Sequence, residues 1–228
     1  MPSDNGNRLS PLDTTAVLLA AGEGQRAGLG RSKAFLVFGG RTLLDIDLER
    51  VSPFCARRLV GLRADDMDRA RDTLVKYGAE AIEGGAERID TVANLLGCVS
   101  SEFVLVYDVA RPFVPAGLLE RLMAGLGDAD GAAPVVRLTL RDSLALIDDN
   151  DGLEAVLPRS QLVMTQGPHL FRTAALADSV DQARRGAWNE VSLMAVIGRA
   201  GLKMAAVAGD PENIKVTYPE DLERLTDT

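Results

Sequence analysis

A glycine-rich stretch that carries two cations follows the first apolar run of the chain. The run TAVLL leads into LAAGEGQRAGLGRSKAF, in which Gly22 and Gly24 precede Arg26 and Lys33. The spacing is not that of a P-loop, and it does not complete a G-x-G-x-x-G motif. Backbone N–H groups of such a loop still bind phosphates, and two cations neutralise charge that grows on a leaving pyrophosphate. We therefore favour a triphosphate clamp over two ordinary surface cations.

An acidic residue closes the apolar run FVLVY. Asp108 ends this run, and Arg111 follows three positions later in YDVARP. A carboxylate at the end of a buried strand is costly unless it is paired or bound to a metal, and its oxygens suit Mg²⁺. We interpret Asp108 as a metal or substrate ligand and Arg111 as a contact for a substrate phosphate. The alternative is a capping or turn residue with Arg111 as its salt-bridge partner.

A second glycine turn occurs in EGGAERIDTV. Gly84 and Gly85 lead into a predicted helix whose first turn holds Arg88, Asp90 and Thr91. These polar side chains could bind a base or a sugar hydroxyl. Plain helix capping explains the same residues equally well.

Three further residues are weaker candidates when each is taken alone. Lys215, in NIKVTYPEDL, is predicted to lie in a short strand, where it could simply point to solvent. His169 has no companion histidine or cysteine, so we interpret it as a packed or hydrogen-bonding residue rather than a catalyst. Trp188 fits either the core or the wall of a pocket.

Bulk composition excludes some classes of partner. The 228 residues carry a net charge of −8 and only 4% aromatic residues. An acidic chain repels a nucleic-acid backbone, and few aromatic side chains leave little surface for base stacking. We expect no nucleic-acid partner, although a local basic pocket can hold a small polyphosphate.

Cysteine use and hydropathy favour a cytoplasmic protein. Cys55 and Cys98 lie far apart, and the single histidine leaves no zinc-site pattern. No apolar stretch approaches the ~18 residues of a membrane span, so we expect no membrane partner. The polar residues 1–13 have no signal-peptide character and are predicted to form a disordered lead-in.

Strand-like and helix-like segments alternate along the chain, which predicts an α/β fold with a mostly parallel sheet. Ligands bind at the carboxyl ends of such strands, where LAAGEG, EGGAER and YDVARP all lie. The predicted strands cover residues 15–21, 57–64, 79–85, 103–108, which a functional-looking tail follows to residue 114, and 131–138. The predicted helices cover residues 42–51, 65–78 and 87–99.

A predicted hairpin interrupts this alternation. SLALIDDNDGLEAVLP reads as two short strands around a turn at residues 149–152, within an excursion of about residues 138–160. Such an excursion either covers the site or grips a second subunit.

Taken together, four motifs resemble those of a known enzyme family. LAAGEGQRAGLGRSKAF, EGGAERIDTV, VYDVARPFV and NIKVTYPEDL occur in this order and at this spacing in the 2-C-methyl-D-erythritol 4-phosphate cytidylyltransferases. The ribitol 5-phosphate cytidylyltransferases are close relatives. The resemblance implies one Rossmann-like α/β domain over residues 14–228, flanked by helices and dimerised through a protruding β-hairpin arm. It also implies CMP transfer from CTP to a polyol phosphate, with Mg²⁺ and with release of pyrophosphate.

The resemblance assigns roles to individual residues. The expected catalytic cations, which hold the phosphates and stabilise the transition state, are Arg26, Lys33 and Lys215. The expected nucleotide-binding residues are Ala20, Ala21, Gly22, Gly24, Gly85, Arg88 and Thr91. The expected acceptor-binding residues are Asp108, which would also bind the metal, Arg111, Ser143, and Arg159 donated by the neighbouring subunit.

The acceptor side departs from the family pattern. Asp142 and Ser143 stand where the family has Asp-Thr, and Ala145 stands where it has a lysine. Its Thr-Pro-Gln becomes Gly167 to His169, and its Thr-Asp-Glu-Ala-Ser becomes WNEVS from Trp188 and Asn189 onward. Three hypotheses follow: methylerythritol phosphate as acceptor in isoprenoid synthesis, another acceptor such as ribitol 5-phosphate or a phosphonate, or a nucleotide-binding homologue without turnover.

Overall fold

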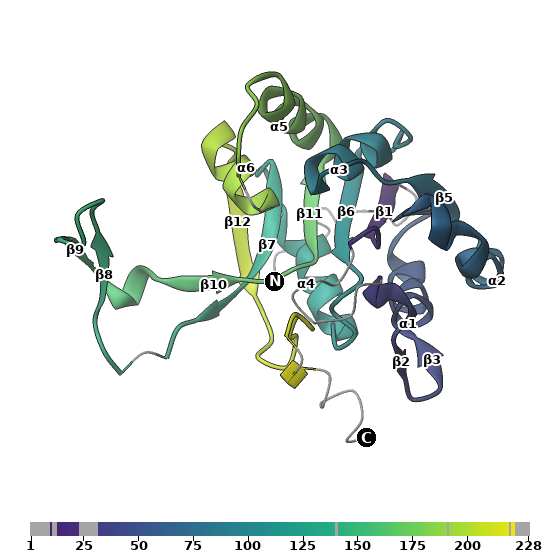
Figure 1. Cartoon of the computed structure of the whole chain (residues 1–228), viewed down its shortest axis with the longest axis horizontal. Helices are drawn as coiled ribbons and strands as arrows, with labels where there is room; N and C mark the ends of the chain where they lie inside the picture. The colour runs from purple at the N-terminus through teal and green to yellow at the C-terminus, as the bar shows by residue number, and fades with distance from the viewer. Residues whose placement is uncertain are drawn as a thin grey trace, which may run out of the picture.

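The computed structural model describes residues 10, 13–22, 32–139, 141–190, 192–218 and 220–221. Within these residues an eight-stranded sheet runs in the order β10-β7-β11-β6-β1-β4-β5, with β12 beside β7 (Figure 1). Its strands are β1 (Thr14–Leu19), β4 (Arg57–Leu62), β5 (Glu80–Glu83), β6 (Phe103–Asp108), β7 (Gly131–Arg137), β10 (Val163–Thr165), β11 (His169–Arg172) and β12 (Met204–Ala208). The helices are α1 (Leu43–Val51), α2 (Met67–Tyr77), α3 (Arg88–Leu96), α4 (Ala116–Gly125), α5 (Thr173–Arg185) and α6 (Leu193–Ala200).

The first half of the chain builds the parallel part of the sheet, as predicted. Strand β1 pairs in parallel with β4 and β6, and β4 pairs in parallel with β5. Leu19 is level with both Gly61 and Asp108 in this register. The carboxyl ends of these strands therefore meet at one edge of the sheet, which confirms the expected convergence of the three motifs.

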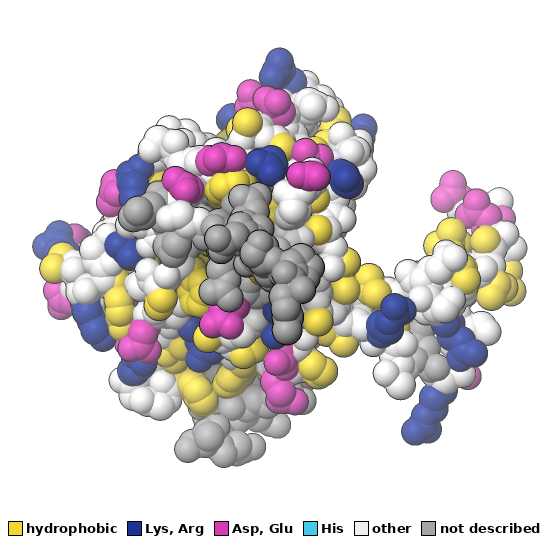
Figure 2. All heavy atoms as spheres, turned by 180° about the vertical axis from the view of Figure 1, so that it is seen from behind, with side chains coloured by type: hydrophobic (Ala, Val, Ile, Leu, Met, Phe, Trp, Pro, Cys, Tyr) yellow, Lys and Arg dark blue, Asp and Glu magenta, His cyan; other side chains and the backbone are white. Residues whose placement is uncertain are grey.

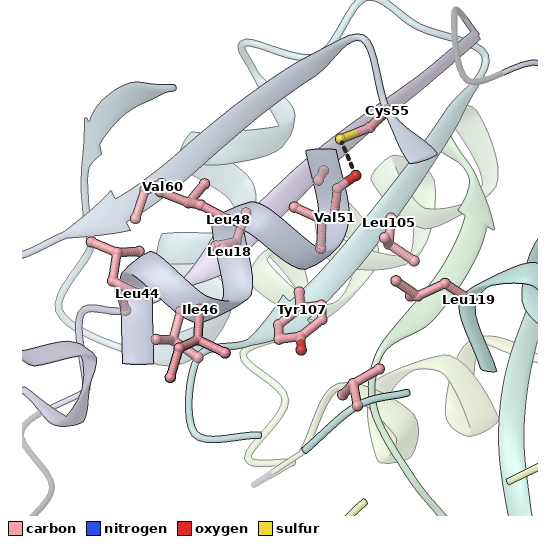
Figure 3. Packing of buried hydrophobic residues seen from close by; sticks show 14 of the residues in the cluster. Leu18, Leu44, Ile46, Leu48, Val51, Cys55, Val60, Leu105, Tyr107 and Leu119 are labelled. Carbon is pink, nitrogen blue, oxygen red and sulfur yellow. Dashed lines mark hydrogen bonds between the residues drawn. The ribbon is translucent and has the colours of Figure 1, made fainter. Parts of the chain in front are cut away.

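Alternating side chains of the central strands build a core on each face of the sheet. Leu105 and Tyr107 of β6 pack with α1, α2 and α4, whereas Val104 and Val106 pack with α3, α5 and α6. Figure 3 shows the Tyr107 ring close to α1, within the first of these two clusters. The helical layers thus hold β6 rigidly, and with it Asp108 at its end.

Helix boundaries follow from local chemistry that is visible in the sequence. The Thr42 hydroxyl accepts a hydrogen bond from the Asp45 N–H and caps α1. At the other end of the next helix, Gly78 has φ +57 and its N–H bonds back to carbonyls of the last turn of α2. The predicted helices 42–51 and 65–78 have these same two boundaries.

The second half of the sheet is mixed. Strand β11 is antiparallel to β6 and β7, β10 is antiparallel to β7, and β12 is parallel to β7. Strands β10, β11 and β12 are not among the predicted strands. They are short, and each is held by pairing with a distant segment, a contact that local periodicity does not register.

The predicted hairpin arm is present and protrudes from the body (Figure 1). Strands β8 (Leu144–Ile147) and β9 (Leu153–Leu157) form a separate two-stranded sheet, which η6 (Arg159–Gln161) connects toward β10. Large apolar side chains on the arm are exposed, and Figure 2 shows apolar side chains on its surface. These are Leu144, Leu146, Ile147, Leu153 and Val156.

The described chain also contains a small hairpin of β2 (Val37–Phe38) with β3 (Arg41–Thr42), and the 3-10 turns η3 (Lys33–Phe35), η4 (Ser52–Phe54) and η5 (Ala64–Asp66). The predicted lead-in, residues 1–13, lies outside the described residues except for Ser10 and Asp13. No helix within the described ranges is long and apolar enough to cross a bilayer.

One predicted element is wrong. Residues 213–217, which include Lys215, form no regular secondary structure instead of the short strand expected there. This segment is called here the C-terminal strap, and it pairs with none of the strands that the structure describes. It is tied down by single backbone contacts, such as Val216 N–H to the Ala110 carbonyl at 2.8 Å.

Candidate active site

A cavity of about 1050 Å³ opens at the carboxyl edge of the parallel strands. It is lined by the chain segments that follow β1, β4, β5 and β6, together with η3 and the C-terminal strap. The predicted site residues on its wall are Ala20, Ala21, Gly22, Lys33, Gly85, Arg88, Thr91, Asp108 and Lys215. The structure thus gathers into one cavity residues that lie almost 200 positions apart. Gly24 and Arg26 lie outside the described residues.

The end of β1 forms one wall of this cavity. The Ala20 N–H donates to the Gly61 carbonyl at 3.0 Å, which extends the β1–β4 pairing by one residue. The Ser32 hydroxyl donates to the Ala20 carbonyl at 2.7 Å and accepts from the Ala34 N–H at 3.2 Å. Ser32 is buried and holds η3, hence Lys33, against the end of β1. It was missed from the sequence because its partner is a distant carbonyl.

The second glycine turn forms the opposite wall. The Thr91 hydroxyl accepts from the Gly85 N–H at 3.0 Å and contacts the Glu87 carbonyl at 3.3 Å. A Cβ atom on Gly85 would lie 2.2 Å from Asp90 Cβ, and one on Gly84 would lie 2.7 Å from Ala21 Cβ. Both glycines are therefore required by close approach of other atoms. Thr91 uses its hydroxyl to shape the turn.

Asp108 lies between two cations at the centre of the cavity. Its Oδ1 is 2.6 Å from Arg88 Nη2, and its Oδ2 is 2.9 Å from Lys215 Nζ. Burial alone would raise the pKa of the Asp108 carboxyl, but Arg88 and Lys215 outweigh burial and hold the pKa well below its usual value. Asp108 is therefore ionised. Its partners are these two cations, rather than Arg111 as the structural alternative supposed.

The C-terminal strap supplies the third wall. Lys33 Nζ donates to the Val216 carbonyl at 2.8 Å, so the cation that follows the glycine loop contacts the strap directly. Lys215, one residue earlier, reaches Asp108. Lys33 and Lys215 thereby face the same cavity from segments at opposite ends of the chain.

Arg111 and His169 lie beside this cavity and are not among the residues that line it. Arg111 Nη1 donates to the Asn213 carbonyl at 2.8 Å, and burial lowers the pKa of its guanidinium. His169 packs against Phe171 with ring centroids 6.1 Å apart. Burial lowers the pKa of His169 to about 4, so the ring is neutral at physiological pH. This agrees with its interpretation as a packed residue.

Ser143 and Arg159 belong to the arm and do not line the cavity. Arg159 is exposed, and its Nη1 donates to the Arg141 carbonyl at 3.1 Å. Within one subunit the arm therefore does not complete the cavity.

Trp188 borders a second hollow of about 580 Å³ between α3 and α5. Arg199 stacks over its indole at 4.4 Å, and the side chain is half-buried. Charged side chains of both signs surround this shallow surface depression. Asp90, from the second glycine motif, lies on its wall and pairs with Arg184 at 3.2 Å.

The charge of the main cavity favours a polyanion. Lys33, Arg63, Arg88 and Lys215 line it, and the carboxylates among its lining residues are Asp108 and Glu87. Within the described part of the chain no group of three or more His, Cys, Asp or Glu residues could hold a metal ion alone. The arrangement suits a phosphate chain held by cations and backbone N–H groups.

Comparisons with known proteins agree with this geometry. The family model for 2-C-methyl-D-erythritol 4-phosphate cytidylyltransferase matches residues 14–226. The chain is 35% identical over 217 residues to the bifunctional enzyme IspD/IspF of Dinoroseobacter shibae. The match covers 93% of this chain and 52% of the relative, so the chain spans about half of that protein. It is 35% identical over 213 residues to the 2-C-methyl-D-erythritol 4-phosphate cytidylyltransferase of Aeromonas hydrophila, covering 91% of the chain and 86% of the relative. The crystal structure of the Thermus thermophilus enzyme of that name superposes with a TM-score of 0.73 at 33% identity, covering 92% of this chain and 95% of the other.

Proposed function

The chain belongs to the 2-C-methyl-D-erythritol 4-phosphate cytidylyltransferase family, and we propose that it transfers CMP from CTP to the phosphate of 2-C-methyl-D-erythritol 4-phosphate. Pyrophosphate is the second product, and the reaction serves isoprenoid precursor synthesis. The observation that carries the proposal is the convergence of Lys33, Arg88 and Lys215 on one cavity at the carboxyl edge of the sheet.

We propose that the cavity binds the triphosphate along its cationic wall. The segment from Ala20 to Gly22 lies beside Lys33, and the turn at Gly85 lies opposite. The triphosphate would run past Lys33 and Lys215, while Arg88 and the Gly84–Gly85 turn would face the cytidine side. Gly24 and Arg26 complete the proposed phosphate-binding loop.

The chemistry needs little covalent participation from the protein. The acceptor phosphate is already an anionic nucleophile at neutral pH, so no general base is required. Catalysis then consists of holding the attacking oxygen in line with the leaving pyrophosphate and of neutralising the charge that develops. Lys33 and Lys215 are placed for the second task, because each is anchored by a fixed protein oxygen.

Mg²⁺ is part of the proposal. This ion usually binds through one or two carboxylates together with substrate phosphates, and the cavity offers Asp108 and Glu87. The donor set fits, and we propose Asp108 as the protein ligand. When bound, the ion would neutralise phosphate charge beside the reacting centre.

We also propose a homodimer in which the arm reaches the neighbouring subunit. Exposed apolar side chains on β8 and β9 support an interface there. In such a dimer Ser143 and Arg159 would contact the acceptor in the partner's cavity. Arg111, the other residue proposed to contact the acceptor phosphate, donates to the Asn213 carbonyl beside the cavity. Two free cysteines, Cys55 and Cys98, support a reducing, cytoplasmic location.

Pyrophosphate release tests the function directly. Purified protein is incubated with Mg²⁺ and CTP, with 2-C-methyl-D-erythritol 4-phosphate, ribitol 5-phosphate and a polyol phosphonate in parallel. We expect turnover with the first acceptor at an ordinary ~1–10³ per second, and turnover about 10²- to 10³-fold slower when Lys33→Met protein is used. Turnover with another acceptor alone would mean that the changes at Ala145, Gly167 and His169 have redirected the pocket. Nucleotide binding without turnover in any reaction would favour the non-catalytic alternative.

A further inference from the structure

Asp47 is a buried carboxyl group that forms no salt bridge with any of the described residues. Its side chain on α1 is 0% exposed, and Oδ2 has no hydrogen-bond partner. Oδ1 lies 3.0 Å from the Tyr107 hydroxyl. Two positions earlier on the same helix, Asp45 pairs with both Arg41 and Lys76. A carboxylate as isolated as that of Asp47 is costly to bury, whereas a neutral acid is not.

The hydrogen atoms around Tyr107 can be counted. Its single hydroxyl oxygen lies 3.0 Å from Asp47 Oδ1 and 3.1 Å from the Arg111 carbonyl oxygen. The carbonyl can only accept, and the hydroxyl carries one hydrogen. Both contacts are hydrogen bonds only if Tyr107 donates to Arg111 and Asp47 donates to Tyr107.

The electrostatic surroundings favour a protonated Asp47. Burial raises the pKa of Asp47 well above its ordinary value, and Asp108 of β6 acts in the same direction. The Tyr107 hydrogen bond and Arg50, on the same helix, act in the opposite direction, and burial dominates. Arg50 is itself engaged with the Val114 carbonyl.

We propose that Asp47 is a neutral carboxylic acid that donates to Tyr107, and that Tyr107 in turn donates to the Arg111 carbonyl. This pair of hydrogen bonds makes Asp47 a positioning residue for the cations of the active site. Asp47 is not among the residues that line the cavity.

Arg111 connects this network to the cavity. Its N–H donates to the Asp108 carbonyl at 3.1 Å, and its guanidinium donates to the Asn213 carbonyl at 2.8 Å. Fixing the Arg111 carbonyl therefore fixes both the turn that carries Asp108 and the start of the C-terminal strap. The strap carries Lys215 and supplies the carbonyl that holds Lys33.

Three variants test whether Asp47 acts as a neutral hydrogen-bond donor, as an ionised acceptor, or only through packing. Asp47→Asn keeps the shape and an N–H donor without charge, so kcat/KM should stay within about twofold of wild type. Asp47→Ala and Tyr107→Phe break the network, and each should lower kcat/KM about 10- to 100-fold, mainly through kcat, as expected for misplaced catalytic groups. The double variant should be no worse than the poorer single variant, because the two residues act as one unit.

Infrared difference spectroscopy tests the protonation state without relying on the proposed function. Wild-type protein at neutral pH should show the C=O stretch of a protonated carboxylic acid, and Asp47→Asn should lose it. Asp45→Asn, which removes an ionised carboxylate from the same helix, should retain it. Absence of this C=O band in wild-type protein would overturn the inference, and this test does not depend on whether Asp47→Ala folds. The inference would also be overturned if Asp47→Asn lowered kcat/KM as much as Asp47→Ala does. If wild type shows the band but turns over no acceptor, the proposed function fails while the neutral acid stands.

Discussion

Lys215 Nζ and Asp108 Oδ2 lie 2.9 Å apart, although 107 positions separate these residues in the chain. The opposite carboxylate oxygen of Asp108 lies 2.6 Å from Arg88. One anion thus holds two cations that would otherwise repel each other beside an anionic substrate. This places Asp108 at the centre of the charge arrangement, whether or not it also binds Mg²⁺.

Replacing Asp108 by Asn should therefore impair catalysis more than folding. The carboxamide keeps the shape but loses the charge that orients Arg88 and Lys215, and we expect kcat/KM to fall roughly 10²-fold or more. Steady-state kinetics at saturating Mg²⁺ measures the effect. Asp181→Asn is the control, because its pair with Arg185, at 3.4 Å, is exposed and such pairs contribute little. Wild-type kinetics for Asp108→Asn would remove Asp108 from the site and from metal binding.

Lys33→Met should lower kcat with little change in stability. The methionine keeps most of the side-chain volume but cannot neutralise phosphate charge from its position beside Val216. Loss of one such electrostatic contact typically lowers kcat about 10²- to 10³-fold. Lys203→Met removes an exposed lysine that does not line the cavity and should leave kcat unchanged. Equal kcat in the two variants would show that Lys33 is an ordinary surface cation.

The two glycine segments should respond differently to a methyl group. Gly85→Ala places Cβ 2.2 Å from Asp90 Cβ and 2.9 Å from its backbone carbon, so we expect a loss of about 1–3 kcal/mol in the free energy of unfolding. Gly22→Ala meets no atom of the described residues within 4 Å, so stability should be unchanged while the KM for CTP rises. Urea unfolding and CTP titration of both variants measure these effects. A destabilised Gly22→Ala or a fully stable Gly85→Ala would contradict this account of the cavity walls.

The pH dependence of stability should carry a signature of Asp47. Because burial raises the pKa of Asp47 in the folded state, its contribution to stability is complete below the ordinary Asp pKa. That contribution is lost as pH rises through the raised pKa, since the unfolded chain releases the proton more readily. Urea unfolding across a pH series should show wild type losing stability relative to Asp47→Asn toward high pH. If the free energies of unfolding of the two proteins changed in parallel with pH, Asp47 would have an ordinary pKa in the folded state.

The parallel half of the fold could be predicted because its strands and helices are marked by local sequence patterns. Apolar periodicity marks β1, α1 and β6, and Thr42 and Gly78 mark helix ends. The position of the cavity could be predicted because ligands bind at the carboxyl ends of the strands in a parallel sheet. Strand β11 and the irregular strap were missed because pairing with distant segments decides their conformation.

The same limit applies to side-chain partners within the site. Types and spacing identified Asp108 as a candidate, and the family resemblance added Lys215. Neither predicted their mutual contact, nor that Arg88 rather than Arg111 completes the ion pair. Ser32 and Asp47 were missed for a related reason. Each is an ordinary polar residue until a partner elsewhere in the chain, Ala20 for Ser32 and Tyr107 for Asp47, gives it a role.

The arm offers a test of whether the site is shared between subunits. If Arg159 acts in the partner's cavity, Arg159→Ala inactivates the arm and Lys33→Met inactivates the cavity. A dimer with one subunit of each kind then contains one intact site, built from the wild-type cavity of the first and the wild-type arm of the second. Mixing the two inactive proteins and allowing subunits to exchange should restore roughly a quarter of wild-type activity, because half of the dimers are mixed and each has one of two sites intact.

The exposed apolar face of the arm supplies the control for this experiment. Leu153 and Val156 are 78% and 67% exposed in the single subunit, so a dimer interface there would bury them. Introducing Leu153→Glu into both inactive proteins should prevent dimer formation, seen by sedimentation, and abolish the recovery. Val75→Glu changes an equally exposed apolar residue on α2, outside the arm, and should leave the recovery intact. A mixture that stays inactive although mixed dimers form would show that Arg159 serves its own subunit or no site at all.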